Sequence, residues 1–230
     1  MPMDAVIFDM DGVLVDSEPL HFATTNAVLS SRGVALDQAD YDPCIGMDEP
    51  SFFALLIDRF GLSDTPAALA RERVTIGLVH LAEHPLPPLP GVLELLLSLQ
   101  AEGKQLALAT SATRAQADLI LDQLGVTRLF SAIVTKDDVS QGKPAPDLFV
   151  EAARQLGVEP QVCLVIEDAV LGVEAARAAG MAAVAFVPSE RGGGDHLRAG
   201  AAAVLPTFSG LTAERLEQLI DDELARLRGP

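Results

Sequence analysis

The chain has 230 residues, of which 49% are hydrophobic, so it can bury a sizeable core as one large domain or as a core domain with a smaller insertion. Its formal net charge of -17 offers no basic patch to displace counterions from phosphates, which argues against nucleic acid or an acidic membrane surface as a partner. The sequence shows neither an apolar run as long as a bilayer span nor the pattern of a signal peptide, so we expect a cytoplasmic protein.

The first third of the chain is expected to contain one strand followed by helices. The stretch AVIFDMDGVLVDS at residues 5–17 begins with a run of apolar residues typical of a buried strand. Apolar residues then recur at spacings of three and four, which predicts helices over 19–32, 49–60 and 65–84. The proline-rich stretch PLPPLPG at 85–91 indicates a linker or boundary.

Beyond this linker, short apolar runs alternate with helical patterns. Strands are predicted at 105–110, 131–135, 162–166 and 181–187, with a weaker one at 201–206. Helices are predicted at 112–125, 146–157, 169–180 and 211–227. This alternation is typical of an α/β fold with a doubly wound parallel sheet covered on both faces. We therefore expect a core domain formed by 1–16 and 88–230, with an inserted helical domain at 17–87.

Polar side chains follow four successive predicted strands. In chain order they are Asp9 and Asp11, then Thr110 and Ser111, then Lys143 at a short remove, then Glu167 and Asp168. Ligands of such sheets bind at the carboxyl ends of the strands, so these side chains are expected to meet at one edge. Asp9, Glu167 and Asp168 are hard oxygen ligands suited to Mg²⁺, which would relieve the repulsion between neighbouring carboxylates.

The same residues have the chemistry for phosphoryl transfer. Carboxylates act as covalent nucleophiles that form aspartyl-phosphates, and Asp9 is placed for that role. Asp11 can protonate the leaving oxygen and later take a proton from water. Thr110 supplies a hydroxyl, Lys143 supplies a point charge for phosphate, and the helix starting near 112 is expected to point its N-terminal amides at the same place.

Each of these short motifs has a plainer interpretation when taken alone. An Asp-x-Asp pair is often a solvated turn, a Lys-Pro pair is mostly a loop, and Glu-Asp or Thr-Ser before a helix is mostly a cap. Their joint occurrence at successive strand ends favours a catalytic site.

The segments FDMDGVLVDSEPLH, ALATSAT, GKPAPDLF and IEDAVLGVEAARAAGM resemble, in this order, the four motifs of the haloacid dehalogenase (HAD) superfamily of aspartate-nucleophile phosphotransferases. The resemblance covers nearly the whole chain, and the nearest subgroup is the β-phosphoglucomutase-like phosphatases. It implies a Rossmann-like core with an α-helical cap inserted after the first motif. It also implies that Asp9 is the nucleophile and Asp11 the acid/base.

The resemblance implies ligands as well. For Mg²⁺ they are Asp9, the backbone carbonyl of Asp11, Asp168 and, as a further ligand or a partner of one, Glu167. For the phosphate they are Thr110, the amide of Ser111 and Lys143. His21 matches a cap histidine that assists the switch to the active conformation in the mutase, and a helix-face residue without this role is an equal interpretation.

Two departures from the mutase pattern bear on the substrate. Glu49, in IGMDEPSFF, falls about where the mutase has an arginine that grips the far phosphate of a bisphosphate. Leu78 falls about where a cap lysine is expected. A carboxylate and an alkyl group in place of two cations should weaken binding of a second phosphate at the cap. The arginines that could compensate are Arg32, Arg59, Arg71 and Arg73.

We therefore predict a Mg²⁺-dependent phosphatase that hydrolyses small phosphomonoesters, with phosphosugars or polyol phosphates as the expected substrates, through an aspartyl-phosphate. The expected state is a monomer or a weak homodimer. One alternative is a β-phosphoglucomutase-type phosphosugar mutase. The alternative without catalysis is an inactive binding protein on the HAD fold, and the presence of Asp9, Asp11 and Lys143 argues against it.

Overall fold

The computed structural model describes residues 3–45, 47–188 and 192–228, except for the side chains of 221–228. The chain divides into two compact units, one formed by Met1–Asp16 with Pro87–Pro230 and the other by Ser17–Leu86. We call the first the core unit and the second the helical unit. None of the described helices is both long enough and apolar enough to cross a lipid bilayer.

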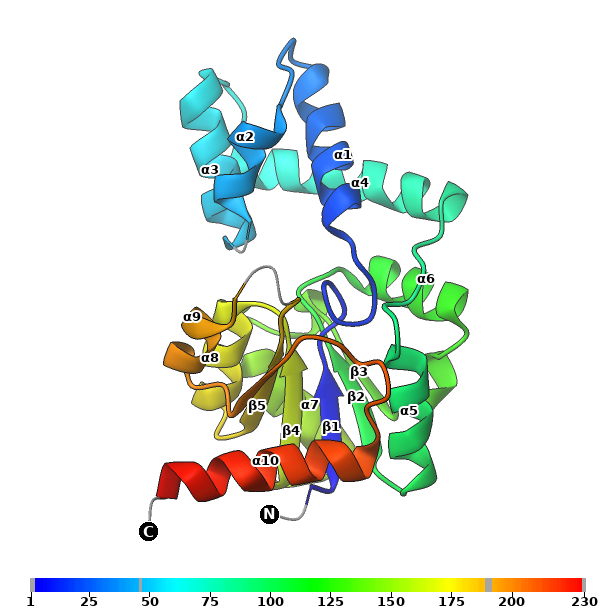
Figure 1. Cartoon of the computed structure of the whole chain (residues 1–230). Coiled ribbons are helices and arrows are strands. Elements are labelled where there is room, and N and C mark those ends of the chain that lie inside the picture. Colours follow the sequence, from blue (N-terminus) through cyan, green and yellow to red (C-terminus); the bar gives the residue numbers. More distant parts are fainter. Residues whose placement is uncertain (1–2, 46, 189–191, 229–230) are drawn as a thin grey trace. The chain divides into compact units, whose positions relative to one another are not determined.

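The core unit is built on a six-stranded sheet in the order β3-β2-β1-β4-β5-β6 (Figure 1). Its strands are β1 (Ala5–Phe8), β2 (Gln105–Ala109), β3 (Ala132–Val134), β4 (Cys163–Glu167), β5 (Ala182–Phe186) and β6 (Ala203–Leu205). All neighbouring strands run parallel. The strand order reverses direction between β1 and β4, and sheets of this type bind ligands at the carboxyl end of that reversal.

The helices of the core unit connect these strands. They are α5 (Val92–Ala101), α6 (Arg114–Leu124), α7 (Asp147–Leu156), α8 (Val170–Ala178), α9 (Gly194–Ala199) and α10 (Ala213–Arg228). Single 3-10 turns lie at η2 (Thr127–Leu129), η3 (Lys136–Asp138) and η4 (Pro160–Val162).

Both faces of the central strand are buried. Ala5 and Ile7 share one apolar cluster with residues of α7 and α8, such as Phe149. Val6 and Phe8, which point to the opposite face because side chains alternate along a strand, are also fully buried. On that side α5 packs on β2, and α10 crosses in front of the strands in Figure 1. The sheet is therefore covered on both faces, which confirms the predicted doubly wound α/β core.

The helical unit has an apolar core of its own. It contains α1 (Glu18–Ser30), α2 (Gln38–Tyr41), the 3-10 turn η1 (Asp42–Cys44), α3 (Glu49–Phe60) and α4 (Pro66–Glu83). Tyr41 meets Phe22 and Phe52 edge to face. The Arg32 guanidinium donates to both carboxylate oxygens of Asp64 and to Glu72. Apolar packing and the ion pairs of Arg32 therefore hold α1 to α4 and to the turn before it.

Three helices were not predicted from the sequence. The stretch VLELLLSLQA of α5 is apolar on nearly every side, so it carries little helical periodicity. The helices α2 and α9 have only four and six residues, too few to show a repeat. The predicted strand at 201–206 is β6, and the predicted helices of the helical unit are α1, α3 and α4.

Candidate active site

Two residues with carboxylate side chains lie next to each other at the carboxyl ends of the two central strands. Asp9 directly follows β1, and Glu167 is the last residue of β4. Phe8 pairs with Ile166 in the parallel register, and the Asp9 N–H donates to the Ile166 carbonyl oxygen over 3.0 Å. The hydrogen-bonded register of the two strands thus places Asp9 and Glu167 at the same height on the carboxyl edge of the sheet.

Asp168 completes a cluster with these two residues. Asp9, Glu167 and Asp168 each offer one carboxylate oxygen, and these oxygens all lie within 4.8 Å of one another. Glu167 is fully buried and Asp9 is 6% exposed. The Glu167 carboxylate also accepts a hydrogen bond from the Ala169 N–H over 2.7 Å, which anchors it at the start of α8.

Lys143 lies within this cluster. Its Nζ donates to Asp9 Oδ1 over 2.8 Å and also to the Glu167 carboxylate. Its side chain is only 8% exposed, and Nζ lies 5.2 Å from the ring centre of Phe149 on α7. The lysine reaches the strand ends from the loop before α7, so a residue more than 130 positions away from Asp9 in the sequence becomes its ion-pair partner.

The protonation of these groups reflects burial and crowding. Burial raises the pKa of Asp9 to about 7; Lys143 opposes this shift, and the neighbouring Glu167 and Asp11 add to it. Burial and the charges of Glu167 and Asp9 also hold the pKa of Asp168 well above its usual range. Although burial lowers the pKa of Lys143, the carboxylates of Asp9 and Glu167 raise it further, so the net shift is upward. The site holds more carboxylates than one ammonium can balance.

This arrangement fits a divalent cation. Three carboxylate oxygens converge within a few ångströms, and carboxylates are the ligands that hard cations such as Mg²⁺ prefer. A bound dication would favour the ionised forms of Asp9 and Asp168, whose pKa values burial and the neighbouring carboxylates raise. The side chain of Asp11 is not among the three whose oxygens converge, and the role of its backbone carbonyl as a metal ligand stays a prediction.

Two glycines make room for the cluster. A Cβ on Gly12 would overlap the carboxylate of Asp168, and one on Gly172, inside α8, would overlap the carboxylate of Glu167. Gly12 also has a φ of 74°, a conformation that disfavours other residues. A glycine within a helical pattern is a recognisable sign of close approach, so Gly172 could have been found from the sequence.

The phosphate-binding residues expected after β2 have a different local geometry from the one predicted. Thr110 is fully buried, and its Oγ1 accepts a hydrogen bond from the Ala112 N–H over 3.1 Å. The helix α6 begins at Arg114, two residues later than expected, behind a capping box formed by Thr113 and Gln116. The Arg114 N–H donates to Asp137 Oδ2 over 2.8 Å. The Arg114 and Gln116 amides at the start of α6 thus have partners within the core unit, and the amide of Ser111 remains the candidate donor at this strand end.

Asp11 lies in a tight loop directly after Asp9. The Gly12 N–H donates to the Val15 carbonyl over 2.8 Å, and Asp11 forms an isolated bridge with Val15. These bonds fix the backbone between the first strand and the start of the helical unit. The roles of Asp11, Thr110 and Ser111 in catalysis stay predictions.

His21 and Glu49 lie in the helical unit. His21 is on α1, where its Nε2 is 3.2 Å from the Ser17 hydroxyl. Glu49 is the first residue of α3 and accepts a hydrogen bond from Arg73 of α4 over 2.5 Å. The Arg73 guanidinium also lies 5.3 Å from the ring centre of Phe53. The structure thus brings Asp9, Lys143, Glu167 and Asp168 together, and the roles of His21 and Glu49 stay predictions.

Known proteins similar to this chain include a phosphatase and a phosphoglucomutase. The family model described as haloacid dehalogenase-like hydrolase matches residues 3–180. Fructose-1-phosphate phosphatase YqaB of Escherichia coli (strain K12) is 37% identical over 78% of this chain and 94% of its own length. Beta-phosphoglucomutase of Bacillus subtilis (strain 168) is 34% identical over 94% of this chain and 95% of its own.

Two further matches differ in the share of the matched protein that this chain covers. A hydrolase from Pseudomonas syringae, solved by crystallography, has a TM-score of 0.78 and 31% identity, with 94% of this chain and 98% of that one covered. Protein SUPPRESSOR OF QUENCHING 1, chloroplastic, of Arabidopsis thaliana is 37% identical, but this chain spans only 18% of its length. The similarity to that plant protein therefore concerns one part of it.

Proposed function

We propose, from the premise that this chain belongs to the haloacid dehalogenase-like hydrolase family, that it is a Mg²⁺-dependent phosphatase of small phosphorylated metabolites. The observation that carries the proposal is the convergence of Asp9, Glu167 and Asp168 with Lys143 at the carboxyl edge of the sheet. The name of the E. coli relative supports phosphosugars as substrates, and we extend this to polyol phosphates.

Asp9 is the proposed nucleophile. One of its oxygens attacks phosphorus while the bond to the leaving oxygen breaks, and Asp11 donates a proton to that oxygen. The aspartyl-phosphate on Asp9 is then attacked by a water molecule that gives its proton to Asp11, which releases inorganic phosphate and restores the carboxylate. Only Met10 separates the nucleophile Asp9 from the acid/base Asp11 in the sequence, so the loop after β1 positions both side chains.

The remaining polar groups bind and orient the phosphoryl group. Lys143 holds one Asp9 oxygen over 2.8 Å, which leaves the other oxygen to attack and places an ammonium charge beside the incoming phosphate. The Ser111 amide and Thr110 contribute at the end of β2. A Mg²⁺ ion held by Asp9, Glu167, Asp168 and the Asp11 carbonyl would offset the charges of nucleophile and phosphate.

We assign substrate selection to the helical unit, which we propose acts as a cap, with Glu49 as a substrate-binding residue. Glu49 replaces a cation with a carboxylate, and its pairing with Arg73 reduces the positive charge available for a second phosphate. The expected substrate is therefore a monophosphate. We further propose that the protein works in the cytoplasm as a monomer or weak homodimer.

The decisive experiment uses Asp9→Asn, which keeps the shape of the side chain and removes the negative nucleophile. Phosphate release from a panel of phosphosugars and polyol phosphates in Mg²⁺ should fall at least about a thousandfold, because the covalent step is lost. Asp4→Asn is the matched control, since Asp4 is exposed at the opposite end of the same strand. Turnover by the Asp9 variant near the parent rate would refute the mechanism.

A phosphosugar mutase is the second candidate, and the similarity to Beta-phosphoglucomutase of B. subtilis favours it. Supplying β-glucose 1-phosphate with a catalytic amount of β-glucose 1,6-bisphosphate separates the two activities. A phosphatase should release inorganic phosphate faster than it forms glucose 6-phosphate. The opposite order of rates would establish the mutase.

A further inference from the structure

His196 contacts the backbone of Asp168, a residue of the carboxylate cluster, and the proposed mechanism gives this histidine no role. It lies on α9, and its Nε2 is 2.7 Å from the backbone carbonyl oxygen of Asp168. A carbonyl oxygen only accepts hydrogen bonds, so Nε2 must carry the proton and donate it. The other ring nitrogen, Nδ1, is buried and has no hydrogen-bond partner among the described residues.

The Asp168 carbonyl needs this donor because it falls between two regular elements. The ladder between β4 and β5 ends with Glu167 paired to Ala185. The first bonds of α8 run from the Gly172 and Val173 amides to the Ala169 carbonyl. Asp168 is past the end of the strand and before the start of the helix, so neither element holds its carbonyl in place.

The carboxylate of Asp168 is also subject to electrostatic repulsion from its neighbours. Its carboxylate faces those of Asp9 and Glu167, and like charges at this distance repel one another. A residue with an unanchored backbone could relieve the repulsion by turning away from the cluster. His196 removes this freedom at the backbone, and Gly12 leaves the space that the Asp168 carboxylate occupies.

The orphaned Nδ1 argues that the histidine is not present for stability alone. A buried polar nitrogen without a partner destabilises a fold. A side chain that donates once and buries a second polar atom unpaired is therefore a poor choice for packing α9 on the sheet. Its single hydrogen bond acts on a residue of the metal cluster.

We infer that His196 is a positioning residue that holds the backbone of Asp168 so that its carboxylate stays directed into the cation site. The inference rests on the proposed function, because it treats the cluster as the place where Mg²⁺ binds. Hydrogen-bonding partners of metal ligands commonly change metal affinity tenfold or more when they are removed.

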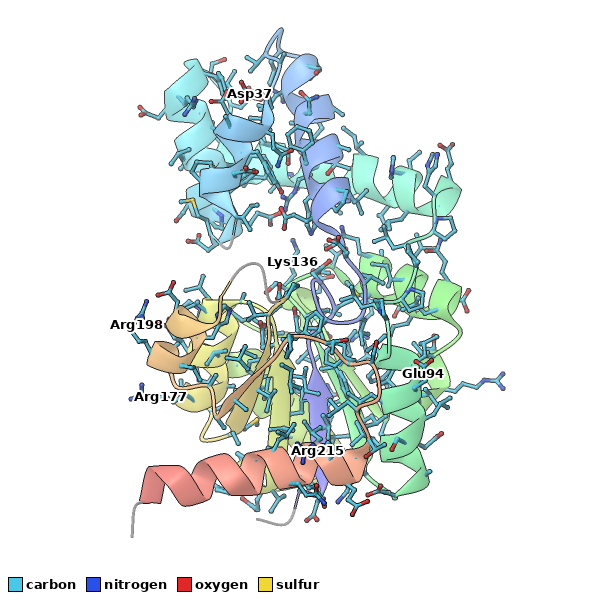
Figure 2. The ribbon with its side chains drawn as sticks, viewed as in Figure 1. Asp37, Glu94, Lys136, Arg177, Arg198 and Arg215 are labelled. Carbon is cyan, nitrogen blue, oxygen red and sulfur yellow. The ribbon has the colours of Figure 1, made fainter. Side chains whose placement is uncertain are left out.

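The test compares His196→Ala with His196→Gln, whose amide N–H can reach the same carbonyl, and with His196→Phe, which keeps a ring without a donor. Titration calorimetry with Mg²⁺ alone should give a dissociation constant about tenfold higher for His196→Ala and His196→Phe, and within about twofold of the parent for His196→Gln. Arg198→Ala is the matched control on the same helix, because Arg198 pairs with Asp195 and points outward (Figure 2). It should leave the Mg²⁺ dissociation constant unchanged.

Amide hydrogen exchange provides a readout that needs neither metal nor substrate. The Gly172 and Val173 amides at the start of α8 should exchange faster in His196→Ala and His196→Phe, but not in His196→Gln. Unchanged exchange and unchanged Mg²⁺ affinity in His196→Phe would overturn the inference, as would a Gln variant as impaired as the Ala variant. A parent protein that binds Mg²⁺ and releases no phosphate would overturn the proposed function and leave the positioning role standing.

Discussion

Gly172→Ala tests the close packing of the site, because helix propensity and steric overlap predict opposite signs for its effect. In an exposed helix interior, replacing glycine with alanine stabilises by about 1 kcal/mol. At position 172 of α8, the added Cβ would overlap the buried carboxylate of Glu167. That carboxylate must then move away from Lys143 and from the Ala169 amide.

The magnitude follows from what the displaced carboxylate loses. Separating one partner from a buried ion pair costs about 3–5 kcal/mol, and the gain in helix propensity offsets about 1 kcal/mol of this. We expect a net loss of about 2–4 kcal/mol in the free energy of unfolding of the core unit. For a chain of this size, that loss lowers the melting temperature by roughly 10 °C. Urea denaturation followed by circular dichroism measures the free energy directly.

A double-mutant cycle with Glu167→Ala isolates the cause. Without the carboxylate there is nothing for the Cβ to overlap, so Gly172→Ala should stabilise the Glu167→Ala background by about 1 kcal/mol. The coupling between the two sites is then about 3–5 kcal/mol. A stabilising effect of Gly172→Ala in the parent, or an equal effect in both backgrounds, would refute the steric explanation.

Three further predictions concern other parts of the molecule. Burial raises the pKa of the Cys163 thiol to about 11, so the thiol ionises more readily in the unfolded chain and ionisation above pH 9 favours unfolding. The stability advantage of the parent over Cys163→Ala, measured by urea titration, should therefore shrink by about 1 kcal/mol between pH 9 and pH 10. Arg32→Met should destabilise the helical unit more than Arg59→Met does, because Arg32 pairs with both Asp64 and Glu72, whereas Arg59 pairs with Asp40 and is half exposed. Protease susceptibility of residues 17–86 distinguishes the two variants. Glu49→Gln releases Arg73 from its ion pair, so it should raise the affinity for a sugar bisphosphate severalfold in an inhibition assay, and an unchanged inhibition constant would contradict this role.

The fold and the metal cluster were predictable because both follow from strand order. Near-continuous apolar runs identified the strands, and residues at the ends of parallel strands must share an edge of the sheet. The positions of Asp9, Glu167 and Asp168 at the ends of neighbouring strands are therefore enough to predict that they cluster. The local hydrogen bonds were not predictable in the same way. The sequence predicts the start of α6 near residue 112, but the Thr113–Gln116 capping box begins the helix at Arg114.

Contacts between distant segments were the least accessible from the sequence. His196 is 28 residues from Asp168 and lies on a helix of six residues, so neither spacing nor periodicity connects the two. The sequence predicts only that Lys143 lies at the same edge of the sheet as Glu167. The ion pairs of Lys143 with Asp9 and Glu167 are seen in the structure. Side-chain pairing depends on the approach of elements in space, which hydrophobic patterns do not encode.

The arginines of the helical unit bear most directly on the choice between a monophosphate and a bisphosphate substrate. Arg32, Arg59, Arg71 and Arg73 were the cations that could replace those missing at Glu49 and Leu78. Three of the four form ion pairs with carboxylates of the same unit: Arg32 with Asp64 and Glu72, Arg59 with Asp40, and Arg73 with Glu49. To bind a second phosphate, each of these three arginines would have to exchange a carboxylate partner for the phosphate. From this charge pairing within the helical unit we predict a substrate with one phosphate, and we predict that Glu49 contributes to that preference by neutralising Arg73.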